Sequence, residues 1–214
     1  MAAKLYAVLI ADVIASSAQR SFRKRLGATL ALASQRHLRR KLIRLPYSVT
    51  AGDEFQTVCA DLRALPQLIL DLRILLQPLS LRIGVGIGRI SDRIEPPVNR
   101  LGGEAFQFAR NAIDAAKSGG SFKFPSLTFF VSRDAAFNET INLIYGLNDT
   151  LLSGVTRKQW NTIAAFTRNP ALANTSRRMN RDASTISRNL KRGYYWQLSA
   201  TVKVAESLLG RTFG

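Results

Sequence analysis

The chain has 214 residues, a formal net charge of +17 and a hydrophobic fraction of 46%. This composition allows a buried core and excludes a disordered tail, and the basic excess favours a polyanionic partner such as nucleic acid, a nucleotide or an anionic membrane surface. No apolar run reaches the length of a membrane span, and the first apolar stretch contains an acid, which argues against a secretory signal. The single cysteine, Cys59, excludes an internal disulfide, so a cytoplasmic location is expected.

The first predicted element is a buried strand over residues 5–11, which form a short apolar run that ends at Asp12. A carboxylate at the end of a buried strand needs a cation or a metal beside it, because burying an unpaired charge is costly. Asp12 is therefore the first candidate site residue.

The segment 19–44 is predicted to be a helix that carries nine Lys or Arg and no acid. These charges are typical of a solvated face, but an alternative is that Arg20 and Arg23, near the helix start, meet phosphates bound at Asp12. A helix that begins after Ser16 would also offer its free N–H groups to a phosphate. His37, the only histidine, is interpreted as a surface residue.

A β-hairpin is predicted around the turn pair Gly52-Asp53, with Val49 before it and Phe55 after it. The carboxylates of Asp53 and Glu54 then lie at the hairpin tip. If the hairpin lies beside the first strand, Asp12 and Asp53 converge. Carboxylates that share a nucleotide's phosphates are the usual ligands of Mg²⁺, and Mn²⁺ has the same preference for oxygen.

The middle of the chain alternates helices and strands. Asp61 is expected to cap a helix over 62–77, and residues 81–90 alternate between large apolar side chains and Arg82, Gly84, Gly86 and Gly88. The glycines leave one face of this strand bare, for either a packed helix or a purine base. A helix over 103–117, an edge strand over 124–131 and a helix over 138–152 follow.

An apolar strand ending in Asp12, a long helix, and Ala51-Gly52-Asp53-Glu54-Phe55 on a hairpin resemble the palm domain of class III nucleotidyl cyclases and GGDEF-type diguanylate cyclases. The chain is similar over almost its whole length to SatD-like proteins, which join such a region to a C-terminal helix-turn-helix. The resemblance implies a ferredoxin-like core that binds a nucleoside triphosphate with Mg²⁺ or Mn²⁺ on Asp12 and Asp53, and with Glu54 as a third ligand. The cyclases carry an Asn and an Arg where this chain has Gln107 and Asn111, which favours binding over cyclisation.

A loop with paired glycines precedes the helix over 103–117, and this connection borders the nucleotide pocket in palm-like enzymes. The resemblance and the local context together indicate a set of small and basic residues for nucleotide binding. These residues are Ser16, Arg20, Arg23, Gly52, Gly103 and Arg110.

The composition changes after residue 152, because residues 151–214 carry 11 Lys or Arg and only two acids. Short helices are predicted over 156–167, 170–179 and 183–190, with a last helix over 197–209. This spacing is typical of a helix-turn-helix, and residues 183–190 resemble the recognition helices of bacterial regulators. The predicted DNA-binding residues are Ser184, Thr185, Ser187, Arg188 and Lys191. The alternative is a helical subdomain that only packs or dimerises.

The sequence thus predicts an α+β protein with a ferredoxin-like (βαββαβ), cyclase-like palm domain over 1–152 and an all-α helix-turn-helix domain over 153–214. The first functional hypothesis is a nucleotide- and DNA-binding regulator. The second is an enzyme that makes a cyclic or oligomeric nucleotide, and the third is a DNA-binding or assembly protein without a nucleotide. A homodimer or a higher assembly is expected, because palm cyclases often need two chains to complete a site.

Overall fold

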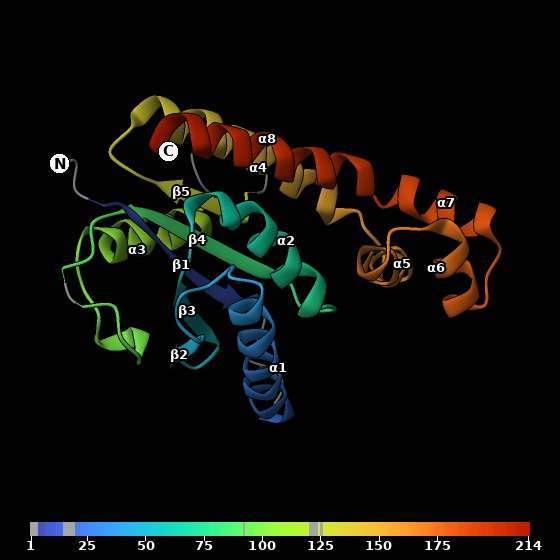
Figure 1. The fold of residues 1–214 in the computed structure, drawn as a ribbon, viewed down its shortest axis with the longest axis horizontal. Coiled ribbons are helices and arrows are strands. Elements are labelled where there is room, and N and C mark those ends of the chain that lie inside the picture. The colour runs from blue at the N-terminus through green and yellow to red at the C-terminus, as the bar shows by residue number, and fades with distance from the viewer. Residues whose placement is uncertain (1–3, 15–19, 92, 120–123, 125) are drawn as a thin grey trace.

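The computed structural model of this chain describes residues 4–14, 20–91, 93–119, 124 and 126–214 (Figure 1). Within these residues the chain is a mixed α+β protein with one five-stranded sheet and eight α-helices. The strands are β1 (Tyr6–Val13), β2 (Ser48–Ala51), β3 (Glu54–Val58), β4 (Leu81–Gly88) and β5 (Thr128–Val131). The helices are α1 (Arg20–Arg39), α2 (Leu65–Leu75), α3 (Glu104–Lys117), α4 (Ala135–Ser153), α5 (Arg157–Arg168), α6 (Leu172–Met179), α7 (Ala183–Arg192) and α8 (Tyr195–Phe213), with short 3₁₀ turns η2 (Leu62–Ala64) and η3 (Val98–Arg100). None of the described helices is both long and apolar enough to cross a membrane.

The sheet has the strand order β2-β3-β1-β4-β5. The pairs β2–β3, β3–β1 and β1–β4 are antiparallel, and β4–β5 is parallel. The predicted hairpin is therefore confirmed, with Gly52 in the left-handed region (φ 61°) at its turn. The hairpin strand β3 lies beside β1, and β5 forms the predicted edge.

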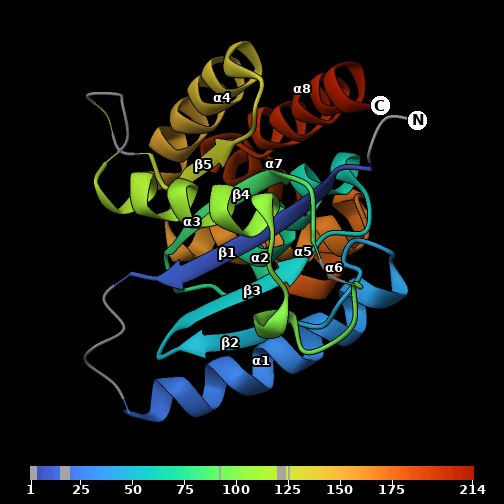
Figure 2. The same ribbon diagram turned by 90° about the vertical axis from the view of Figure 1, so that its left-hand side faces the viewer.

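The sheet lies between two layers of helices, as Figure 2 shows. Residues Ala7, Leu9 and Ala11 of β1 face the layer that contains α1, α2, α4 and α8, whereas Val8 and Ile10 face α3. Alternate residues of a strand point to opposite faces, so Asp12 also lies on the α3 face.

The glycines of β4 are covered by α3. Of the two alternatives for this bare face, a packed helix or a purine base, the structure thus has the helix. An added Cβ at Gly84 would lie 2.3 Å from the backbone nitrogen of Ile113, and one at Gly86 would lie 2.1 Å from the backbone oxygen of Ala105. Ordinary van der Waals contact begins at about 3.4–4 Å. The glycine stripe therefore lets a helix approach the sheet closely, and no purine base is needed to explain it.

A buried ion pair joins α2 to α4. The Arg73 Nη2 atom lies 2.8 Å from Asp149 Oδ1 and donates to Thr128 Oγ1 at 2.6 Å. The second Asp149 oxygen accepts from the Leu127 N–H at 2.9 Å. Burial raises the pKa of Asp149, and although Arg73 and these hydrogen bonds oppose that effect, the pKa stays above its ordinary value. The carboxylate thus depends on Arg73 for its charge.

His37 is fully buried, so its interpretation as a surface residue was wrong. Its Nδ1 atom lies 2.8 Å from the Tyr47 hydroxyl, and its Nε2 atom lies 3.8 Å from Asp71. Burial lowers the pKa of His37 from 6.5 to about 4; Asp71 opposes this change, and Arg40 and Arg36 add to it. The basic residues around His37 indicated an exposed helix face, whereas the ring points from α1 into the core.

Acidification is expected to destabilise the protein through His37. The folded-state pKa of about 4 lies below the ordinary 6.5, so the unfolded chain binds a proton more tightly. Stability is full above pH 6.5 and falls as the pH approaches 4, by about 3 kcal/mol from this group. Urea unfolding across this range measures the loss, and His37→Gln should remove most of it. An equal pH dependence in His37→Gln would contradict the assignment.

The last helix, α8, returns from the C-terminal helices to the sheet region (Figure 1). Its residues Ala205 and Leu209 are buried in the same core as α2 and α4, and Phe213 packs edge-on against Phe137 of α4 with ring centroids 4.8 Å apart. Residues that the sequence assigned to the second domain therefore complete the core of the first region.

Candidate functional site

Polar side chains meet where β1 ends and β3 and β4 begin. The β1–β3 register pairs Ala11 with Phe55, so the next pair along is Asp12 with Glu54. On the other side of β1, Asp12 lies opposite Arg82 of β4. The register thus places Glu54, rather than Asp53, beside Asp12.

Three cations surround these two acids and form what we call the ion-pair cluster: Asp12, Glu54, Arg82, Arg110 and Lys117. Arg110 binds both oxygens of Glu54, with two N–O distances of 2.8 Å. The Lys117 Nζ atom lies 3.5 Å from Asp12 and 3.6 Å from Glu54, and Arg82 lies 3.4 Å from Asp12. With three bases and two acids, the cluster carries one formal positive charge.

The charges of the ion-pair cluster stabilise one another at the protein surface. Burial alone would raise the pKa of Glu54, but the hydrogen bonds and charges of Arg110, Thr50 and Lys117 hold it below its usual value. The hydrogen bond to Glu54 in turn raises the pKa of Arg110. The acids are about 10% exposed, whereas the Arg110 and Lys117 side chains are 46% and 40% exposed. A ligand from solvent would therefore meet the cations first.

The predicted nucleotide-binding residues do not all gather here. Arg110 is in the cluster, and Gly52 lies in the turn just before β3. Gly103 lies at the opposite end of α3 from Lys117, where a φ of 118° brings its backbone against residues 89–91. Ser16 lies outside the described residues. Arg20 and Arg23 fall in the first turn of α1, and their side chains are also outside the description.

Two members of the cluster, Arg82 and Lys117, were missed by the sequence analysis. Arg82 stands on the same side of its strand as the glycines, so its position on the α3 face was readable from the alternation. Lys117 is seven residues after Arg110 and therefore on the same face of a 3.6-residue helix. The sequence did not show that α3 covers this face of the sheet, so neither cation could be placed beside Asp12 and Glu54.

The donor set of the cluster does not fit Mg²⁺ or Mn²⁺ as it stands. The described residues contain no group of three or more His, Cys, Asp or Glu placed to hold a metal ion. Asp12 and Glu54 already share their charge with three basic side chains. A divalent cation would have to displace those bases, so the predicted metal ligands stay a prediction without geometric support.

A second candidate site lies in α5, α6 and α7, which we call the C-terminal helical unit. Its core contains Trp160, Ile163 and Phe166 of α5 with Ile186 and Leu190 of α7. Thr156 caps α5 as predicted, in a capping box with Gln159. The unit rests on α2, because Leu70 and Ile74 pack against the same core.

The turn between α6 and α7 is made without glycine. Asn180 ends α6 in the left-handed conformation (φ 49°, ψ 55°), which asparagine tolerates better than most residues. The Ser176 hydroxyl donates to the carbonyl of Arg181 across this turn. A tight turn therefore joins two helices that pack on a common third helix.

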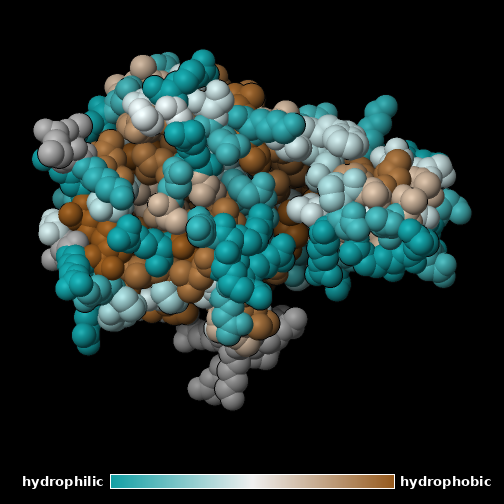
Figure 3. Space-filling view, in the orientation of Figure 1, coloured by the Kyte–Doolittle hydropathy of each residue, from teal (hydrophilic) through white to brown (hydrophobic). Residues whose placement is uncertain are grey.

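The outer face of α7 is polar and basic. Ile186 and Leu190 are fully buried, whereas Ser184, Ser187, Arg188 and Lys191 are exposed and Thr185 is half-buried. Figure 3 also shows hydrophilic side chains along the lower side of this lobe, where α5 and α6 lie. Four of the five predicted DNA-binding residues thus face solvent on one helix.

Comparison with known proteins identifies a family. The model of the SatD family matches residues 6–194, which include the ion-pair cluster and the C-terminal helical unit through α7. No curated protein matches the chain.

Proposed function

The chain belongs to the SatD family, and from this premise we propose that it is a regulator that binds duplex DNA through α7 and a nucleotide at the ion-pair cluster. The antiparallel order β2-β3-β1-β4, with α1 and α2 as its connections, supports the ferredoxin-like, palm-like part of this proposal. The C-terminal helical unit supports the helix-turn-helix part. A homodimer stays a prediction.

The observation that carries the proposal is the division of α7 into two faces. Its apolar side fills the core of the C-terminal helical unit, and its opposite side presents hydroxyls, Arg188 and Lys191. In a helix-turn-helix, residues near the start of the second helix contact base edges. Arg and Lys further along that helix neutralise phosphates. Ser184 and Ser187 then read bases, and Arg188 and Lys191 bind the backbone.

Titration of a labelled duplex about two helical turns long tests this role of α7. In Arg188→Ala/Lys191→Ala the slope of log affinity against log salt should fall by about two, because each phosphate contact contributes about 0.9. The matched control is Lys203→Ala/Arg211→Ala, which removes the same charge from exposed positions on α8. Equal effects of the two variants, or no binding by the unchanged protein, would overturn DNA binding by α7.

The ion-pair cluster supports the nucleotide half of the proposal. Its three cations carry one charge more than its two acids, and Arg110 and Lys117 are the most exposed members. A nucleotide's phosphates would replace the carboxylates as partners of these two bases, because both groups accept charge-assisted hydrogen bonds. The same cluster gives no comparable support to the enzymatic alternative, since nucleotidyl transfer on two carboxylate-bound metals requires Asp12 free of its cations.

The link between the two sites is tested in the same titration. Arg82 follows Ser80 by two residues, and Ser80 lines a cavity of about 260 Å³ together with Arg157 and Trp160 of α5. A nucleoside triphosphate that moves Arg82 would therefore act next to the C-terminal helical unit. ATP, GTP, CTP or UTP should change the DNA affinity of the unchanged protein and not of Lys117→Gln. Release of pyrophosphate in these mixtures would instead favour the enzyme.

A further inference from the structure

Two acid-free segments, distant in the sequence, meet on one side of the molecule. Residues 13–52 and 150–181 contain no Asp or Glu. A cavity of about 110 Å³ lies where the two segments meet. Arg36, near the end of α1, lines it from the first segment, and Arg168, at the end of α5, lines it from the second. Their juxtaposition concentrates positive charge that neither segment holds alone.

A hydrogen bond between α6 and α5 extends this basic surface toward α6. The Arg178 guanidinium donates to the backbone oxygen of Ala165, one helical turn before Arg168 on α5. We call the resulting surface the basic ridge, and it consists of Arg36, Arg39, Lys41, Arg168 and Arg178. All but Arg36, which is half-buried, are exposed.

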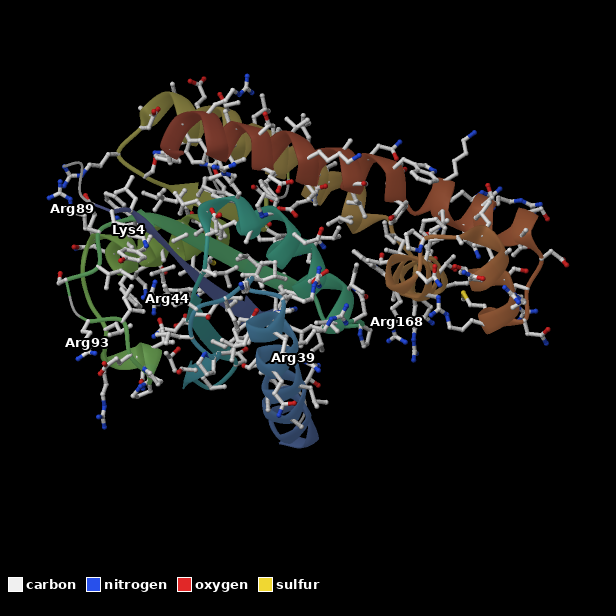
Figure 4. The ribbon with its side chains drawn as sticks, viewed as in Figure 1. Lys4, Arg39, Arg44, Arg89, Arg93 and Arg168 are labelled. Carbon is white, nitrogen blue, oxygen red and sulfur yellow. The ribbon has the colours of Figure 1, made fainter. Side chains whose placement is uncertain are left out.

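The acid that lines the shared cavity is paired with a cation. Asp71 lines the same cavity, but it is 4% exposed and paired with Arg40. Arg39, Lys41 and Arg168 are exposed, and no ion pair is found for them among the described residues. Figure 4 shows Arg39 at the end of α1 and Arg168 at the end of α5, with the end of α2 between these helices.

We infer that the basic ridge is a phosphate-binding surface for duplex DNA, separate from the exposed face of α7. A row of cations without intervening acids fits the regular phosphates of a duplex backbone, which supply affinity without sequence preference. Helices α1, α5 and α6 carry four of the five cations, and Lys41 follows α1 by two residues, so little ordering of the backbone is required on binding. The choice of DNA rests on the proposed function of α7, whereas the ridge itself rests on its own contacts and charges.

The test compares two triple variants that remove the same charge. Arg39→Gln/Lys41→Gln/Arg168→Gln alters the ridge, and Lys4→Gln/Arg89→Gln/Arg93→Gln alters exposed cations at the opposite end of the molecule (Figure 4). The ridge variant should bind a mixed-sequence duplex roughly tenfold more weakly at moderate salt, with a salt slope lower by about two to three. The control variant should change the affinity less than twofold. Thermal unfolding confirms that both variants fold.

The outcomes separate the ridge from α7. If the ridge variant bound the duplex as tightly as its control while the salt slope of the α7 variant fell, the ridge would be overturned. The proposed function would remain intact. Loss in the ridge variant with no effect of the α7 variant would support the ridge and overturn the role of α7. The assignment to duplex DNA would be overturned if the unchanged protein bound single-stranded RNA more tightly than the duplex and the ridge variant weakened both equally.

Discussion

Gly86→Ala is expected to destabilise the protein by about 3 kcal/mol, at the upper end of the usual cost of overpacking. The added methyl group would lie 2.1 Å from the Ala105 oxygen and 2.2 Å from the Ala109 nitrogen. Both are backbone atoms of α3, so no side chain can rotate away and the whole helix must move. Urea unfolding followed by circular dichroism gives the free energy of unfolding.

The same substitution in α1 provides the control. Gly27 has no atom within 4 Å of an added Cβ. Gly27→Ala should therefore stabilise the protein by about 0.5–1 kcal/mol, because alanine favours the helix and restricts the unfolded chain. If Gly86→Ala were as stable as Gly27→Ala, the close contact between α3 and the sheet would be wrong.

Arg73→Leu should cost about 3–5 kcal/mol, the usual loss when one member of a buried ion pair is removed. Asp149 is 1% exposed and would lose its counter-ion, so it would either hold an unpaired charge in the core or take up a proton, and both cost free energy. The fitting comparison is Arg93→Leu, since Arg93 and Glu95 have the same N–O distance of 2.8 Å but are exposed. That variant should lose less than about 1 kcal/mol, because water screens a surface pair.

The pH dependence of Arg73→Leu identifies the cause of its loss. Burial already raises the pKa of Asp149 in the folded protein, and removal of Arg73 takes away the largest opposing effect. The folded variant then binds a proton more tightly than the unfolded chain, so its deficit against the unchanged protein narrows as the pH falls from about 8 to about 5. Arg73→Leu/Asp149→Asn should recover part of the stability. A deficit that is constant with pH would indicate lost packing instead.

Local features were predictable from the sequence because neighbouring residues determine them. The Gly52-Asp53 turn, the cap at Thr156 and the alternation of β4 each depend on a few adjacent side chains. The apolar spacing of α7 likewise identified which residues face the core. This spacing predicts which of the proposed DNA-binding residues are buried and which are exposed. It says nothing of contacts with DNA, which stay a prediction.

Features that depend on packing between distant segments were not predictable. The basic run of α1 indicated solvent exposure for His37, but the ring is buried against Tyr47, just before the hairpin, and Asp71 of α2. Asp12, Glu54 and Arg110 were recognised as candidate site residues, yet the sequence did not indicate that Arg82 and Lys117 would join them. The register of β1 with β3 decided between Asp53 and Glu54 as the neighbour of Asp12, and no local pattern encodes that register.

Helix α8 connects the C-terminal helical unit to the core of the sheet region. Its 19 residues span about 28 Å at 1.5 Å per residue, from the end of α7 to a core that it shares with α2 and α4. A tilt of about 5° around its core end would sweep its other end through about 2.5 Å, close to the length of a hydrogen bond. If α2, on which the unit also rests, moves with α8, a small displacement near Leu209 becomes larger at α7. In the proposed dimer, the distance between the two copies of α7 would then change by up to twice the displacement at α7.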